Sequence, residues 1–172
     1  MAKRISLREF QEGLARRLAQ ASTTDRRTLL GVEAGGQNWL LPLEEAGEIL
    51  PVPPLAEVPL TQSWFRGLAN VRGTLHGVVD FGAWCGGSAT PPLGNARLVL
   101  MGAKHGINSA ILVSRALGLR SPDDFEPDES TRPDPQPWLE DTWRDVQGRP
   151  WLRLNISALL HQSRFLEAGI ES

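Results

Sequence analysis

Between Thr28 and Leu154 the chain is divided into short apolar runs, each a few residues long and bounded by glycine or proline. Thr28–Val32 and Asn38–Leu41 stand on either side of the glycine pair at 35–36, which is the pattern of a β-hairpin. Seventeen glycines and 13 prolines in 172 residues leave little room for long helices. The pattern therefore predicts a mainly β chain built from short strands.

The remaining strands follow from the same alternation of apolar runs and turns. They are predicted at 46–52, 64–71, 74–81, 97–101, 106–113, 116–119, 138–146 and 151–154. The loop at Gly86–Asn95 separates about five strands from about five more, so the sequence predicts two small barrels that meet near this loop. Together they form a domain at 28–168, within which the proline- and acid-rich stretch 121–137 is expected to be a mobile loop.

Two helices are predicted to flank the strands. Leu7, Phe10, Leu14 and Leu18 recur at steps of three and four, after an S-x-x-E capping box that starts at Ser6, so we expect 1–27 to form an amphipathic helix followed by a linker from residue 21. Its apolar stripe is expected to dock on its own domain or on a partner. Because the helix is rich in arginine, docking on an anionic membrane is the alternative.

The C-terminal helix is predicted from the apolar residues Ile156, Leu159, Leu160 and Phe165. Asn155 precedes them as the expected N-cap, and Gly169 stands where a helix-ending glycine is expected.

The composition excludes several classes of protein. A net charge of -2 and a pI of about 5.9 argue against a protein that binds nucleic acid over its whole surface. The single cysteine, Cys85, excludes an internal disulfide framework and a cysteine-based zinc site. No apolar run approaches the roughly 20 residues of a membrane helix, and no signal-peptide core follows the N-terminus.

The sequence also offers no convergent catalytic set. His76, His105 and His161 lack the spacing of a metal-binding helix, and Cys85 has no evident base to activate it as a nucleophile. The acidic stretch lacks the spacing of a calcium loop. We therefore expect a protein without metal, cofactor or enzymatic activity.

The stretch from Trp64 to Asp80 is the part of the sequence that says most about function. Gly67 and Gly73 allow backbone conformations that a Cβ would penalise. Arg72 is expected to project from a tight turn, where its guanidinium could bind a carboxylate of a partner. The alternative is that Arg72 pairs within its own domain, with Asp80 or with backbone carbonyls as candidate partners.

This block resembles the signature of the CheW-like domain family, G-x-x-N-L-R-G-x-h-x-P-V-h-D-L, in which h is hydrophobic. The matching positions are Gly67, Asn70, Arg72, Gly73, Val78 or Val79, and Asp80. The departures are Val71 for leucine, Gly77 for proline and Phe81 for leucine. A weaker similarity extends from Thr28 to Phe165.

The resemblance implies two five-stranded SH3-like β-barrels and a non-enzymatic adaptor. Such an adaptor joins the cytoplasmic tip of a chemoreceptor to the regulatory domain of a CheA-type histidine kinase, in the cytoplasm at the inner face of the membrane and without inserting into it. On this basis the expected partner-binding residues are Ile49, Trp64, Phe65, Asn70, Val71, Arg72 and Val79. The expected structural turn residues are Gly67, Gly73 and Asp80.

Two departures from the family pattern indicate which branch of the family the chain resembles. Ser114-Arg115 stands where the family usually has V-D-x-V, and the basic N-terminal helix is extra to the minimal domain. In both features the chain resembles adaptors of chemosensory pathways that control type IV pili and twitching motility. The alternatives are an adaptor of flagellar chemotaxis and, more remotely, a small nucleic-acid-binding barrel.

Overall fold

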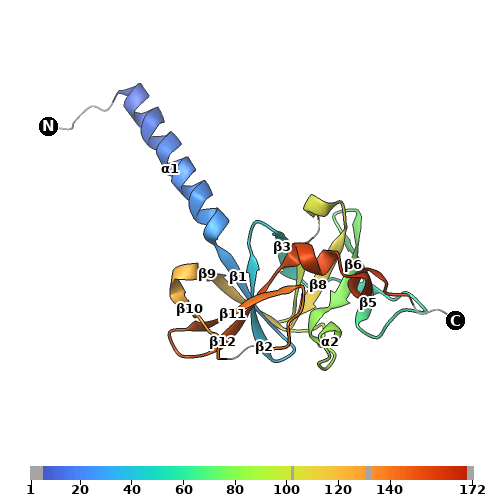
Figure 1. The fold of residues 1–172 in the computed structure, drawn as a ribbon. Coiled ribbons are helices and arrows are strands. Elements are labelled where there is room, and N and C mark those ends of the chain that lie inside the picture. The colour runs from blue at the N-terminus through green and yellow to red at the C-terminus, as the bar shows by residue number, and fades with distance from the viewer. Residues whose placement is uncertain (1–5, 102, 131–132, 170–172) are drawn as a thin grey trace.

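A computed structural model of the chain describes residues 6–101, 103–130 and 133–169. A long helix, α1 (Leu7–Arg27), leads into a body made of two six-stranded sheets (Figure 1). The prediction of a mainly β protein with two sheet subdomains is thereby confirmed, with six strands per sheet where about five were expected. Short helices and 3-10 turns connect the strands: α2 (Phe81–Trp84), η1 (Ala103–His105), η2 (Pro122–Asp124), α3 (Ile156–Leu160) and α4 (Ser163–Leu166).

The first sheet, sheet A, takes strands from both ends of the chain. In spatial order it contains β10 (Phe125–Pro127), β11 (Leu139–Asp145), β12 (Pro150–Leu154), β2 (Gln37–Pro42), β1 (Leu29–Ala34) and β9 (Arg115–Arg120). All neighbours are antiparallel except β12 and β2, which pair in parallel.

The second sheet, sheet B, is formed by the middle of the chain alone. Its spatial order is β3 (Ala46–Pro51), β7 (Arg97–Met101), β8 (Ser109–Val113), β6 (Thr74–Asp80), β5 (Phe65–Val71) and β4 (Leu55–Ala56). The chain therefore passes between the sheets after β2 and after β8. The expected boundary near Gly86–Asn95 was wrong, because that loop joins α2 to β7 within sheet B.

A shared hydrophobic core joins the two sheets. Sheet A contributes buried side chains such as Val32 and Leu41, and sheet B contributes Val99 and Ile111. The helices after the last strand close this core with Phe165. Since one apolar cluster spans both sheets, they are packed on each other.

The predicted hairpins have the expected tight turns. Gly35 and Gly36 connect β1 to β2 with φ values of 60° and 76°, and a two-residue turn with two positive φ values matches the twist of paired strands. The β11–β12 turn is held by Asp145, whose carboxylate accepts from the backbone of Gln147 and Arg149 and from the Trp151 indole. Burial raises the pKa of Asp145, but these hydrogen bonds outweigh it and lower the pKa to about 2.

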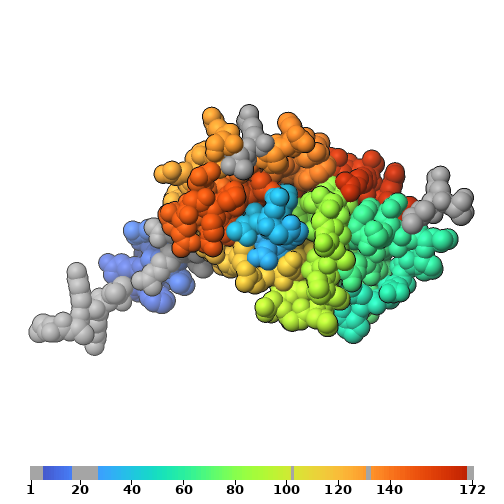
Figure 2. All heavy atoms as spheres, turned by 90° about the horizontal axis from the view of Figure 1, so that it is seen from below, coloured from blue at the N-terminus to red at the C-terminus, as the bar shows by residue number. Residues whose placement is uncertain are grey.

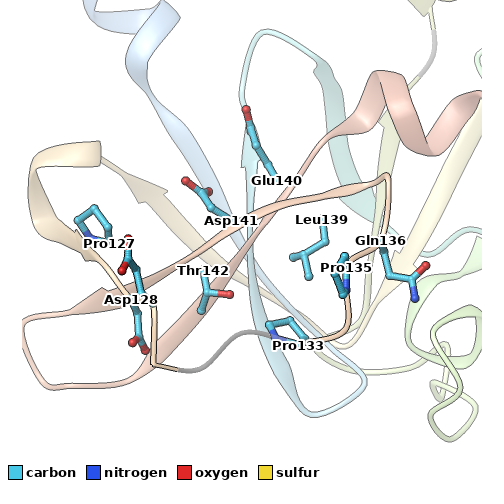
Figure 3. Close-up of a pocket in the computed structure, with 10 residues that line it drawn as sticks. Pro127, Asp128, Pro133, Pro135, Gln136, Leu139, Glu140, Asp141 and Thr142 are labelled. Carbon is cyan, nitrogen blue, oxygen red and sulfur yellow. The ribbon is translucent and has the colours of Figure 1, made fainter.

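The described residues of the acidic stretch, 121–130 and 133–137, contain regular structure that the prediction of a loop did not include. Phe125–Pro127 forms a strand that pairs with β11, and Asp123 and Asp128 bind Arg27 and Arg144. A cavity of about 530 Å³ lies between β11 and the proline segment that precedes it, and Figure 3 shows residues that line it. Leu139 and Thr142 face that segment, while Glu140 and Asp141 point to the other side (Figure 3).

The C-terminal prediction is correct at its start and wrong at its end. Asn155 caps α3 by accepting from the Ala158 N–H at 2.9 Å. The helix stops at Leu160, and a second short helix, α4, carries Phe165. Gly169 does not end a helix but pairs with Thr61 in an isolated β-bridge.

The N-terminal helix stands away from the body (Figure 1). Its predicted capping box is present, because Ser6 and Glu9 exchange backbone and side-chain hydrogen bonds at 3.0 and 3.2 Å. The helix continues to Arg27 without the expected linker. Leu7 and Phe10 are 73% and 60% exposed, so this part of the stripe does not dock on the barrels, contrary to one of the two expected placements.

We therefore expect deletion of residues 1–21 to leave the stability of the body unchanged. Leu7, Phe10 and Leu14 of this segment are 73%, 60% and 47% exposed, and loss of an exposed segment changes the free energy of unfolding by about 0.5 kcal/mol or less. The thermal midpoint, followed by near-ultraviolet circular dichroism, should stay within about 2 °C. A drop of more than about 5 °C would show that the helix packs on the body in solution.

Candidate functional site

The family motif forms the β5–β6 hairpin and presents Arg72 at its tip. Val71 pairs with Thr74, so Arg72 and Gly73 form a two-residue turn with φ values of 50° and 85°. Asn70 fixes the turn, because its side-chain oxygen accepts from the Gly73 N–H at 2.9 Å. The three motif residues thus hold an exposed arginine in one orientation, as the sequence predicted for Arg72 and Gly73.

Arg72 is bound by Glu48 of β3, which the sequence analysis did not identify. Its two terminal nitrogens each donate to one oxygen of the Glu48 carboxylate, Nη1 at 3.0 Å. This hydrogen bonding lowers the pKa of Glu48 and raises that of Arg72. The alternative prediction, that Arg72 pairs within its own chain, is thereby confirmed with Glu48 as the partner. Asp80, the partner suggested from the sequence, binds Arg66 instead.

A groove opens beside this ion pair. The cavity has a volume of about 310 Å³ and runs between β3, β6, β7 and the segment that leads into β8. Its lining includes Glu48, His76, Leu100, Ile107 and Asn108. The groove therefore joins apolar side chains to the charged tip of the hairpin, a combination that suits binding of another protein chain.

The other predicted partner-binding residues differ in how deeply they are buried. Phe65, Val71 and Ile49 are half-buried, and Phe65 and Ile49 pack against the shared core. Trp64 and Val79 are only 7% and 3% exposed. These last two are core residues, so their assignment to a partner surface was wrong.

Gly67 and Asp80 were predicted as structural turn residues, but both lie in strands. Gly67 lies in β5 with φ of 114°, where a Cβ would be 2.1 Å from the Ala56 carbonyl oxygen. The fully buried Asp80 caps α2 by accepting from the Ala83 N–H. Its carboxylate also accepts from Thr90, at 2.6 Å from the backbone and 2.7 Å from the hydroxyl, and from Arg66 at 3.3 Å.

Of the features weighed for catalysis, only two histidines are seen to meet in the described residues, with the ring centroids of His105 and His161 6.1 Å apart. Cys85 is exposed as a residue, but partial burial of its sulfur raises the thiol pKa, offset only in part by the charge of Arg164. The neutral thiol therefore prevails at pH 7 and is a poor nucleophile. Within the described ranges, no three histidine, cysteine or acidic side chains are grouped to hold a metal ion. No described helix has the length and apolar character needed to cross a membrane.

Comparisons with known proteins agree with the hairpin motif. Protein PilI of Pseudomonas aeruginosa is 28% identical over 160 residues, which cover 88% of this chain and 85% of that protein. The crystal structure of the scaffolding protein TtCheW from Thermoanaerobacter tengcongensis shares the fold with a TM-score of 0.63 and 13% identity, over 76% of this chain and 89% of that one. A model of the CheW-like domain matches residues 28–164. Since this match spans most of the chain and contains the Asn70–Gly73 hairpin, the chain belongs to the CheW-like domain family.

Proposed function

We propose that this protein is a non-enzymatic adaptor that couples a chemoreceptor to a CheA-type histidine kinase. The observation that carries the proposal is the Arg72–Glu48 pair, held at the tip of the motif hairpin beside an apolar groove. An exposed arginine already oriented by a turn loses little side-chain entropy when it binds a partner. The likeness to PilI and to the scaffolding protein TtCheW supports the same function.

The receptor and the kinase are assigned to different surfaces in this proposal. The receptor tip binds the groove and Arg72. The kinase binds elsewhere, through its own regulatory domain of the same fold. Loss of Arg72 should therefore weaken receptor binding selectively.

Replacement of Arg72 by alanine tests this function. Breaking an interface contact of a guanidinium costs on the order of 2–4 kcal/mol, so receptor affinity should fall roughly 30- to 1000-fold. The thermal midpoint should hardly change, because an exposed ion pair contributes about 0–1 kcal/mol to folding and the Arg72 side chain is 72% exposed. Calorimetric titration with a receptor tip fragment and, separately, with the kinase regulatory domain measures both affinities.

Two further variants help to interpret the result for Arg72→Ala. Arg72→Lys should restore little affinity, since lysine keeps the charge but not the bidentate geometry. Arg115→Ala breaks a comparable exposed pair with Glu33 on sheet A and should leave receptor binding unchanged. Equal weakening toward receptor and kinase by Arg72→Ala, or a large drop in its thermal midpoint, would show that Arg72 supports the fold and that the receptor site lies elsewhere.

We further propose that the pathway controls type IV pili and twitching motility. The similarity to PilI spans 88% of this chain and supports this branch over flagellar chemotaxis. In the native cell, deletion of the protein should abolish twitching on a surface and leave swimming intact. Loss of swimming with normal twitching would place it in the flagellar pathway.

A further inference from the structure

The N-terminal helix carries an apolar stripe that the described part of its own chain leaves uncovered. Leu7, Phe10 and Leu14 recur along one side of α1 and are all exposed. A single residue separates α1 from β1, and Arg27 at the end of the helix forms an ion pair with Asp123 at 3.1 Å. The helix is thereby attached to the body at its end and points away from it (Figure 1). Since a helix gains most of its stability by packing its apolar face, the free stripe indicates a partner from another molecule.

The surface that matches this stripe is the cavity of about 530 Å³ beside β11, which we call the proline groove. Its lining includes three exposed prolines, Pro127, Pro133 and Pro135, and the half-buried Leu139. Leu139 points from β11 toward Pro133 and Pro135 (Figure 3). A groove with an exposed apolar lining can receive the apolar face of a helix, which is a recurring mode of recognition between protein chains.

The helix and the groove have opposite charge. The segment 1–27 contains seven basic and three acidic residues, whereas 121–137 contains six acidic residues and one basic residue. Four residues that line the groove are acidic and none of its described lining is basic: Asp128, Glu129, Glu140 and Asp141. Three of these carboxylates pair with arginines of sheet A, while the exposed Glu129 forms no ion pair with a described residue. Charge therefore favours contact of the helix with the groove and opposes contact between two such helices.

The helix and the groove of one chain lie apart. In Figure 2 the blue atoms of α1 lie at the left, beside the body, and the orange segments around β10 and β11 form the upper edge. We propose that the proline groove binds the N-terminal helix of a second copy of this chain. In a two-fold pair each chain donates its helix and receives that of the other, so that the contact forms twice and the assembly closes as a dimer. The proposal is independent of the adaptor function, because it involves neither Arg72 nor its groove.

Sedimentation equilibrium of the full chain tests the dimer. We expect a Kd on the order of 10 µM, because two helix faces of this size bury less area than a large permanent interface. Phe10→Asp places a charge in the apolar stripe and should weaken self-association by about tenfold or more. Glu129→Lys/Pro135→Lys places two positive charges in the groove and should have an effect of the same size.

A matched control shows whether the groove variant acts through its position. Glu57→Lys makes the same charge change at an exposed residue that follows β4 in sheet B and should leave the Kd unchanged. All variants change exposed residues, so their thermal midpoints should stay within about 2 °C of that of the unmodified chain.

A mixture of the two weakened variants identifies the contact. Phe10→Asp keeps an intact groove, and Glu129→Lys/Pro135→Lys keeps an intact helix, so together they should form a heterodimer. This heterodimer has one of the two contacts, and its Kd should be on the order of 100 µM, weaker than that of the unmodified chain.

Four results would overturn the proposal. A full chain that stays monomeric up to about 1 mM, well above the expected Kd, excludes the dimer. Undiminished self-association of Glu129→Lys/Pro135→Lys shows that the helices pair with each other, and a mixture that does not associate excludes the exchange of helix and groove. Binding of a monomeric chain to phosphatidylglycerol vesicles, lost in Phe10→Asp, assigns the stripe to an anionic membrane.

Discussion

Replacement of Gly67 by alanine should destabilise the protein by about 2–5 kcal/mol, which adds the cost of a left-handed backbone conformation to that of overpacking. The new methyl group would be 2.1 Å from the Ala56 carbonyl oxygen, a backbone atom that cannot move aside without opening the β4–β5 pairing. For a chain of this length the thermal midpoint should fall by about 4–20 °C. Thermal and urea unfolding both measure the change.

Gly73→Ala is the matched control. Gly73 also has a positive φ, of 85°, but a Cβ there would have no atom within 4 Å. This variant should cost only the backbone penalty, about 1–2 kcal/mol. If both variants lose the same stability, the close approach of β4 to β5 contributes nothing and the effect is one of backbone conformation alone.

Replacement of Asp80 by alanine should be at least as damaging, at about 3–5 kcal/mol. The change leaves the Arg66 guanidinium without its buried counter-charge and removes the acceptor of the Thr90 backbone, the Thr90 hydroxyl and the Ala83 N–H. Buried donors left unpaired each cost about 1–3 kcal/mol. Urea unfolding gives the free energy, and far-ultraviolet circular dichroism shows whether the sheets persist.

Asp80→Asn separates the lost charge from the lost acceptors. Its amide oxygen can still accept from Ala83 or Thr90, so we expect an intermediate loss of stability. Glu33→Ala, which breaks the exposed pair with Arg115, should cost no more than about 1 kcal/mol. A loss below about 1 kcal/mol for Asp80→Ala would contradict a role for this carboxylate in joining α2 to the loop that carries Thr90.

The local elements were predictable because they depend on neighbours in the sequence. The two-residue turns at 35–36 and 72–73, the cap at Ser6 and the cap at Asn155 all rest on residues within a few positions of each other. The alternation of apolar residues also located most strands. It did not show which apolar residues stay at the surface. Trp64 and Val79, which the family resemblance assigned to a partner surface, belong to the core.

The candidate site was predictable only in part, since it depends on contacts across the chain. Glu48 is 24 residues before Arg72 and meets it because β3 and the β5–β6 hairpin belong to the same sheet. Nothing in the local pattern distinguishes Glu48 from the neighbouring acids at 44 and 45. The boundary between the two sheets was not predictable either. Long-range strand pairing determines where the chain crosses from one sheet to the other, after β2 and after β8.

The crossing of the chain between the two sheets has a consequence for folding during synthesis. Sheet B consists of the continuous segment from Ala46 to Val113, whereas β1 and β2 lack their outer neighbours until β9 and β12 have been made. We therefore expect the middle of the nascent chain to fold before its beginning is complete. Once sheet B has formed, it holds the ends of β2 and β9 within a short reach and lowers the entropy lost when sheet A closes. The later strands β9 and β12 thus complete a sheet that the earlier strands β1 and β2 began.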